Sequence, residues 1–193
     1  IPVLKKKKTL EYSECERLLA RLYILTGRFE EADRHLARSL AFETKKNGSM
    51  LKFNGMDDEI MLLIHKGLFL EAKERTNELV QTKFDLLKTK KHRLLVIPYQ
   101  LAAQVYSATG DYSNAEEFGL LAKESSRMAY GDSSMPYFKS LSILSRVHSS
   151  YGDYDRALEM ANASYKGICD NFGNKHPEAA QPLIDIAMVW LQK

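Results

Sequence analysis

Apolar residues recur along this chain at every third or fourth position, in long stretches that short polar breaks separate. In the first stretch Leu18, Leu22 and Leu25 fall on one face of a helix, and the later stretches keep a similar spacing. No stretch reads as a strand. The pattern therefore predicts an all-α protein with helices at about 11–26, 28–45, 50–66, 69–90, 94–109, 112–130, 136–151, 154–171 and 177–192.

The breaks inside successive pairs of predicted helices share a six-residue pattern, Gly-x-aromatic-x-x-Ala. Its glycines are Gly27, Gly67, Gly110 and Gly152, which follow one another at intervals of 40, 43 and 42 residues. Glycine adopts the left-handed conformation that ends a helix at little cost. Alanine is small enough for two helices to cross closely. A pattern that recurs at a near-constant period is typical of a repeat protein in which helix hairpins stack on one another.

The repeats predict the domain organisation. We expect a linker at residues 1–10 and one repeat domain at residues 11–193. The repeats fall at about 11–49, 50–91, 92–133 and 134–175, and a final helix at 177–192 has no following helix to cover it. Because the chain opens at Ile1 and ends at Lys193 inside a helical pattern, we expect it to be an excerpt from a longer protein.

This arrangement resembles a tetratricopeptide repeat (TPR) array. That family has a small residue seven positions before the corner glycine and an aromatic residue four positions before it. The chain matches both positions with Ala20 and Tyr23, with Ala103 and Tyr106, and with Ala187 and Trp190 in the final helix. The period near 42 residues and the linker at 171–178 resemble repeats of the kinesin-light-chain type. The resemblance implies a right-handed α-solenoid of antiparallel helix hairpins.

The resemblance also implies a concave groove that binds a peptide or a partner subunit, lined by the first helix of each hairpin. Kinesin-light-chain-type repeats have paired asparagines on these helices, where this chain has Arg17-Leu18, Asp57-Asp58, Gln100-Leu101, Ser142-Ile143 and Ile184-Asp185. The resemblance therefore implies the fold rather than a kinesin-like role. The groove positions that it implies are Arg17, Arg21, Met61, His65, Gln100, Gln104, Ser142, Arg146, Asp185 and Met188.

Three of these groove residues, Arg21, Gln104 and Arg146, are equivalent in repeats one, three and four. Donors spaced along a groove can hold peptide carbonyls, and arginine can bind a carboxylate through two hydrogen bonds. The alternative interpretation is that the groove residues are ordinary solvated side chains.

Charge and cysteine usage narrow the function classes. The chain has 28 Lys and Arg against 25 Asp and Glu, a net charge of +3, which argues against a dedicated nucleic-acid binder. Two basic runs, residues 5–8 and 88–93, leave open the docking of an acidic partner, a phosphorylated segment or RNA. Cys15 and Cys169 lie far apart, which favours a reducing, cytoplasmic setting. No run approaches the roughly 18 apolar residues of a membrane span.

The sequence predicts no catalytic, cofactor-binding or metal-ligating residue. The five histidines do not form a metal-binding pair such as His-Glu-x-x-His, and the serines lack a Gly-x-Ser-x-Gly turn. We interpret Asp57 and Asp58 as a solvated pair rather than as a general acid and base. The glycines mark helix ends and form no phosphate-binding loop.

We therefore expect a non-enzymatic protein-interaction scaffold or adaptor. A second hypothesis is that this is the regulatory or sensor segment of a larger enzyme or signalling protein whose catalytic part lies outside the 193 residues. The apolar face of the final helix is a further candidate surface, for self-association or for a following repeat.

Overall fold

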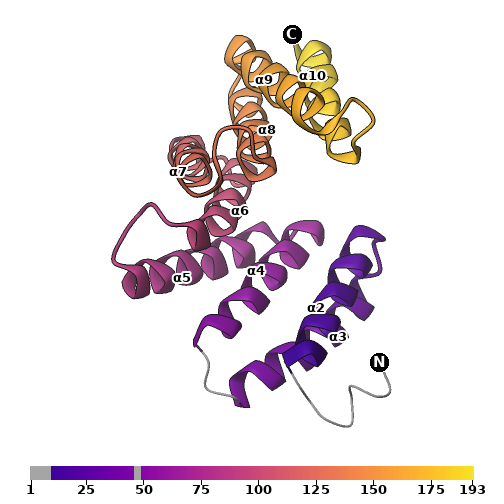
Figure 1. Ribbon diagram of the computed structural model, residues 1–193, viewed down its shortest axis with the longest axis vertical. Coiled ribbons are helices and arrows are strands. Elements are labelled where there is room, and N and C mark those ends of the chain that lie inside the picture. Colours follow the sequence, from indigo (N-terminus) through magenta and orange to yellow (C-terminus); the bar gives the residue numbers. More distant parts are fainter. Residues whose placement is uncertain (1–9, 46–48) are drawn as a thin grey trace. The chain divides into compact units, whose positions relative to one another are not determined.

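The computed structural model describes residues 10–45 and 49–193. Its helices are α2 (Leu10–Leu25), α3 (Phe29–Lys45), α4 (Ser49–His65), α5 (Phe69–Leu87), α6 (Val96–Ala108), α7 (Tyr112–Tyr130), α8 (Met135–Ser150), α9 (Tyr154–Phe172) and α10 (Ala180–Gln192) (Figure 1). Short 3-10 turns, η1 (Arg93–Leu95) and η2 (Pro177–Ala179), precede α6 and α10. No described residue lies in a strand, and the predicted all-α fold class is confirmed.

The chain divides into two compact units, residues 1–79 and 80–193, with the boundary inside α5. In the first unit α2 packs against α3 and α4. Its core consists of Ala20, Ile24, Ala32, Leu36 and Leu62, with Tyr23, Phe29 and Met61 packed around them. These side chains come from the apolar faces of three helices, and their burial from water is the main source of this unit's stability.

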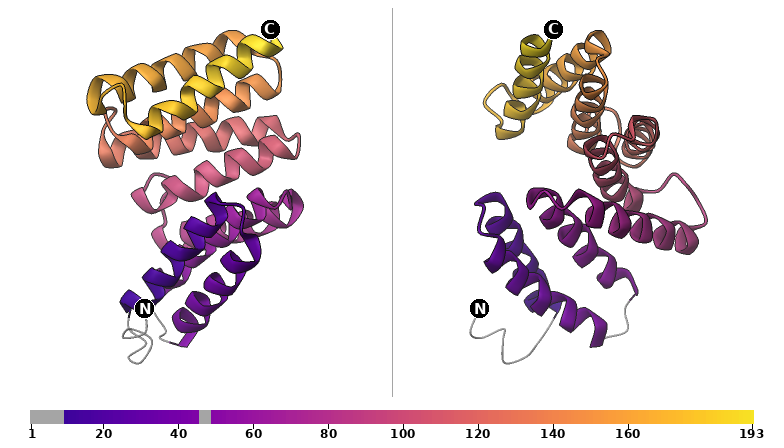
Figure 2. Two further views of the ribbon diagram at one scale, coloured as in Figure 1. Left: turned by 90° about the vertical axis from the view of Figure 1, so that its right-hand side faces the viewer. Right: turned by 180° about the vertical axis from the view of Figure 1, so that it is seen from behind.

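In the second unit consecutive helices run antiparallel and lie side by side, as the two views of Figure 2 show. α6 packs against α7, α7 against α8, α8 against α9, and α9 against α10. The first helices of successive hairpins also touch one another, α6 with α8 and α8 with α10. We call α2, α4, α6, α8 and α10 the A helices.

The repeated glycines form the hairpin corners. Gly27, Gly67, Gly110 and Gly152 all have positive φ, between 71° and 89°, which is the left-handed conformation that other residues adopt only with strain. At two corners the aspartate that follows caps the next helix. Asp111 accepts a hydrogen bond from the Asn114 backbone N–H, and Asp153 accepts one from Arg156. The corner pattern therefore ends one helix and starts the next.

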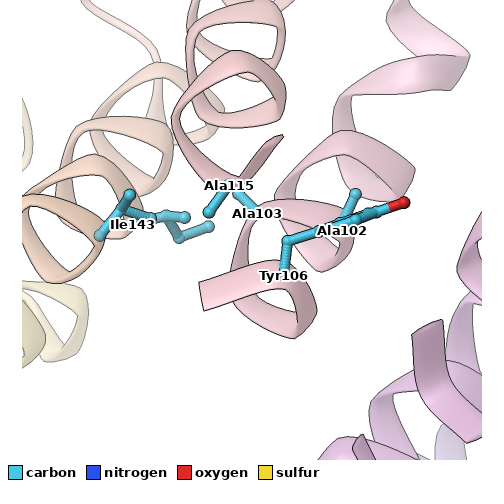
Figure 3. Close-up of a cluster of buried hydrophobic side chains, with 6 residues drawn as sticks. Ala102, Ala103, Tyr106, Ala115 and Ile143 are labelled. Atoms are coloured by element: carbon cyan, nitrogen blue, oxygen red, sulfur yellow. The ribbon is translucent and has the colours of Figure 1, made fainter. Parts of the chain in front are cut away.

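Small residues allow the helices to cross closely within the second unit. Ala103 is fully buried and Tyr106 is 9% exposed, at the two positions that the sequence comparison of the repeats singled out. They pack with Ala102 and Ala115, and with Ile143 of the next hairpin (Figure 3). Tyr106 also stacks on Phe118 of α7, with ring centroids 5.3 Å apart. One buried cluster thus joins three helices.

α4 begins at Ser49, one residue before the predicted start, and runs through Asn54 and Gly55. The predicted linker falls almost entirely on residues 1–9, which lie outside the described residues together with the basic run 5–8. None of the described helices is long and apolar enough to cross a membrane.

Candidate functional site

In the first unit, two predicted groove residues, Arg17 and Arg21, donate hydrogen bonds to the buried carboxylate of Asp58. Arg17 Nε donates to Asp58 Oδ2 at 2.8 Å, and Arg21 Nε donates to Asp58 Oδ1 at 2.6 Å. The Asp58 side chain is 1% exposed, while those of Arg17 and Arg21 are 15% and 38% exposed. These bonds connect α2 to α4, so the two guanidinium groups have a structural partner within the chain.

The interpretation of Asp57 and Asp58 as solvated is wrong. Asp57 is 6% exposed and Asp58 is fully buried. The sequence could not show this, because the partners of Asp58 lie about 40 positions earlier in the chain. Of the other predicted residues in this unit, Met61 packs partly buried against the core, and exposed His65 has its Nδ1 2.9 Å from the Met61 carbonyl oxygen.

On α6, the two predicted glutamines form hydrogen bonds within the second unit. Gln100 Nε2 donates to the Pro136 carbonyl at 3.1 Å and to Ser140 Oγ at 2.9 Å, which connects α6 to the start of α8. Gln104 Nε2 donates to the Gln100 carbonyl at 3.1 Å. Gln104 is partly buried, and this bond uses its amide nitrogen as the donor.

Three predicted residues line a pocket between α8 and α10, within the second unit. The pocket has a volume of about 300 Å³ and contains Arg146, Asp185 and Met188. Its remaining lining residues are Ser145, Ser149, Ser150, Gln181, Ile184, Val189 and Gln192. A hydrogen bond of 2.6 Å from Ser149 Oγ to Gln192 Oε1 joins the two helices beside it. The pocket therefore combines one cation, one carboxylate, several amides and hydroxyls, and an apolar rim.

Asp185 is the most unusual group in this pocket. It is only 3% exposed, and its Oδ1 accepts a hydrogen bond of 3.0 Å from Gln181 Nε2. Oδ2 has no hydrogen-bond partner among the described residues. Burial raises the pKa of Asp185, and the Gln181 amide, the positive charge of Arg146 and the Ser142 hydroxyl only partly offset this.

The hydroxyl of the predicted groove residue Ser142 lowers the pKa of Asp185, but it also contacts a second hydroxyl. Ser164 Oγ donates to the Phe138 carbonyl at 2.8 Å, so the 3.0 Å contact between the Ser142 and Ser164 hydroxyls uses the proton of Ser142. In that arrangement Ser142 donates to Ser164 rather than to Asp185, and Asp185 Oδ2 keeps no hydrogen-bond partner. A buried carboxylate oxygen without a donor is costly to keep.

Replacing Asp185 with Asn should stabilise the protein by about 1–2 kcal/mol at neutral pH, because it removes a buried and incompletely paired charge. The raised pKa means that the folded state holds this proton more tightly than the unfolded state. The gain should therefore be absent below the ordinary aspartate value of 3.8, grow as the pH rises through the folded-state pKa, and then level off. Urea unfolding of both proteins between pH 4.5 and 8 measures it. A gain that is constant over this range would contradict the assignment.

The sequence prediction missed seven residues of the pocket: Ser145, Ser149, Ser150, Gln181, Ile184, Val189 and Gln192. For five of them, Ser145, Ser149, Gln181, Val189 and Gln192, the spacing contains the signal, because residues three, four or seven positions from Ser142 or Asp185 share a helix face with that residue. In residues 10–45 and 49–193, no group of three or more His, Cys, Asp or Glu is arranged to hold a metal ion.

Comparisons with known proteins agree with this architecture. A family model for the tetratricopeptide repeat matches residues 15–48. The structure of BtubC (BKLC) from P. vanneervenii is 18% identical, with 93% of this chain and 72% of that chain covered and a TM-score of 0.74. A candidate kinesin light chain from Podosopora anserina, with nearly identical TPR-like repeats, is 18% identical, with coverages of 93% and 85% and a TM-score of 0.70. No curated protein matches. At this identity the structural likeness concerns the fold.

Proposed function

We propose that this chain, which has the fold of a tetratricopeptide repeat array, is a protein-interaction scaffold or adaptor that binds a peptide or partner subunit along the A helices of its second unit, α6, α8 and α10. The proposal rests on the pocket between α8 and α10, where Arg146 and Asp185 present polar groups on two packed helices. A preformed pocket on rigid helices lowers the entropic cost of ordering the receptor when a ligand binds.

The geometry of α6 extends this surface. α6 and α8 pack against each other, and Gln104 and Arg146 stand at equivalent positions, six residues before their corner glycines. A glutamine carbonyl and an arginine guanidinium offer an acceptor and several donors to an extended peptide. The proposed role is non-catalytic. A cytoplasmic location and self-association through the exposed Trp190 and Leu191 of α10 remain predictions.

Replacing Gln104 and Arg146 together with Ala should weaken binding of the natural partner by at least about tenfold, because each loses polar contacts to the ligand. Partners captured by the wild-type chain are first identified, and their affinities for both proteins are then measured by calorimetry. Arg21 is left intact, because its removal would disturb Asp58 whether or not a ligand binds there.

A matched control is Arg156→Ala with Asn162→Ala, which changes one cation and one amide at exposed positions of α9. Partner affinity should be unchanged in this control. Equal affinities of the wild-type chain and the Gln104→Ala/Arg146→Ala variant, with helicity retained in both, would count against the A-helix surface as the binding site.

A further inference from the structure

The basic run 88–93 joins α5 to α6, and its backbone is tied to both helices. Lys88 ends α5 with a φ of 53°, and its N–H donates to the Phe84 carbonyl at 2.8 Å. The Tyr99 hydroxyl of α6 donates to the Lys90 carbonyl at 3.1 Å. The cations of this run are therefore carried by a backbone with defined contacts inside the second unit.

The cations of this run differ in their partners. Lys88 and Lys91 form ion pairs with carboxylates of α5 and α7, at 3.9 and 3.5 Å. Lys90 and Arg93 are exposed, and neither side chain has an ion pair or hydrogen bond among the described residues. Two positive charges of the run are thus left for a ligand.

A pocket of about 220 Å³ lies next to one of these cations, Lys90. Its apolar walls include Val80 and Phe84 of α5 and Phe118 and Leu121 of α7, all of them partly buried. Covering the remaining exposed surface of these side chains with an apolar group is favourable. The volume is smaller than that of most cofactor and small-molecule pockets, so a single side chain fits it better.

The free charges around the pocket favour an anionic ligand. Glu117 of α7 also lines the pocket, is exposed and has no ion pair among the described residues. Burial raises the pKa of Tyr99, and the nearby negative charge of Glu117 adds to this. Lys90 and Arg93 together outweigh this one carboxylate, so acidic groups are attracted more strongly than basic ones.

The aromatic side chains of this region favour a peptide over RNA as the acidic ligand. Recognition of single-stranded RNA depends on exposed aromatic faces on which bases stack. Among the described residues, none of the exposed aromatic side chains lies on α5, on α6 or in the run between them. Phe84 and Phe118 instead form walls of a pocket that accepts an apolar side chain.

We propose that the pocket bordered by α5, α7 and Lys90 binds a large aliphatic side chain, such as that of leucine, from an acidic partner peptide. Lys90 and Arg93 pair with the carboxylates that flank this side chain in the peptide. The pocket walls come from second helices of the hairpins, so this surface is a binding site in addition to the A-helix surface.

The test is an NMR titration of the ¹⁵N-labelled full chain with acetyl-Glu-Asp-Leu-Asp-Glu-amide at about 50 mM salt, where ionic attraction is weakly screened. Saturable shifts are expected at residues 80–93 and 117–121, with a Kd of about 0.1–1 mM. A peptide with Ala in place of Leu should bind at least about fivefold more weakly, because it leaves the pocket empty. A peptide with Lys in place of the four acids should bind at least about tenfold more weakly. A decauridine RNA should bind more weakly than the acidic peptide.

Protein variants probe the charges with a sign for each. Lys90→Gln with Arg93→Gln should weaken peptide binding at least about fivefold, whereas Glu117→Gln should strengthen it about twofold because a repulsion is removed. The matched control is Lys166→Gln with Lys175→Gln, which removes the same charge at exposed positions elsewhere in the second unit and should leave binding unchanged. Gln104→Ala/Arg146→Ala should also leave it unchanged, because those residues lie on the A helices.

Absence of saturable binding, equal binding of the alanine or lysine peptide, or tighter binding of the RNA would overturn this assignment. So would weaker binding by Glu117→Gln, or equal losses in the lysine control and in Lys90→Gln/Arg93→Gln. These peptide comparisons use the wild-type chain, so they do not depend on the folding of any variant. Loss of acidic-peptide binding in Gln104→Ala/Arg146→Ala would place the peptide on the A-helix surface, which retains the proposed function and overturns only the pocket at Lys90.

Discussion

Replacing Arg17 and Arg21 together with Ala is expected to destabilise the first unit by about 3–5 kcal/mol, the usual cost of removing the partners of a buried charge. Asp58 is fully buried, and these two guanidinium groups donate to its two oxygens at 2.8 and 2.6 Å. Without them the carboxylate must stay uncompensated, take up a proton or draw water into the space between α2 and α4. Each of these alternatives costs stability.

The loss of stability is measured by urea unfolding, with circular dichroism to monitor all helices. Because a repeat array can unfold in more than one step, this signal is compared with a local probe. The fluorescence of Trp190, the single tryptophan, reports on α10 in the second unit and should be less affected. Adding Asp58→Leu to the double variant should restore much of the loss, because the unpaired charge is then gone. This rescue distinguishes loss of charge pairing from loss of arginine packing.

A control with the same change in charge is Arg28→Ala with Arg34→Ala, both at exposed positions of the first unit. Exposed arginines contribute little to stability, because water already solvates them and salt screens their charge. A double variant of Arg17 and Arg21 that is no less stable than this control would show that Asp58 does not depend on them. The predicted use of Arg17 and Arg21 as ligand donors would then regain support.

The second large effect is expected at Phe138, whose replacement with Ala should cost about 3–5 kcal/mol in the second unit. Phe138 is 4% exposed and packs with Leu141, Ile168 and Ala179 between α8, α9 and η2. Its ring lies directly over the backbone of α9 at Gly167. A Cβ at that position would stand only 2.1 Å from the Phe138 Cε1 atom. The aromatic ring therefore fits only because position 167 has no side chain.

This contact predicts a change of sign at Gly167. In the wild-type protein Gly167→Ala should destabilise by about 1–3 kcal/mol, because the methyl group collides with a buried ring. In the Phe138→Ala background the same substitution should be neutral or stabilising by up to about 1 kcal/mol, because Ala favours the helix and the cavity accepts its methyl group. Unfolding followed by Trp190 fluorescence gives the four free energies of this double-mutant cycle.

Tyr130→Ala supplies the control for losing an aromatic ring, since Tyr130 is 50% exposed at the end of α7. It should cost far less than Phe138→Ala. If Gly167→Ala has the same effect with and without the ring at position 138, the two residues do not interact as the structure indicates, and the close crossing of α8 and α9 has another cause.

Most of the fold could be predicted from the sequence, because the information is local. The spacing of apolar residues gave nine helices whose observed ends lie within a few residues of the predicted ones. Gly27, Gly67, Gly110 and Gly152 mark corners because a positive φ is required there, and this requirement acts on one residue at a time. Ala103 and Tyr106 are buried as their place in the repeat predicts.

The candidate site could be predicted only in outline. The resemblance to tetratricopeptide repeats implied the A-helix face and the ten residues on it. It could not distinguish Arg21 from Arg146, which have the same position in their repeats. The surroundings of the two arginines differ because the residue one turn before each is Arg17 in the first case and Ser142 in the second.

The sequence by itself determined where the helices begin and end and which of them pair as hairpins, since the corner patterns that decide this are local. It did not determine which face each helix buries, because Leu18, Leu22 and Leu25, which share one face in the sequence pattern, are 57%, 54% and 75% exposed. Only the tertiary structure decided which polar side chains are already paired. Asp58 and Asp185 look alike in sequence, yet one is closed by two arginines and the other borders an open pocket. A hydrogen bond depends on distances of a few tenths of an ångström between atoms that lie about 40 residues apart in the chain, and no local pattern encodes such distances.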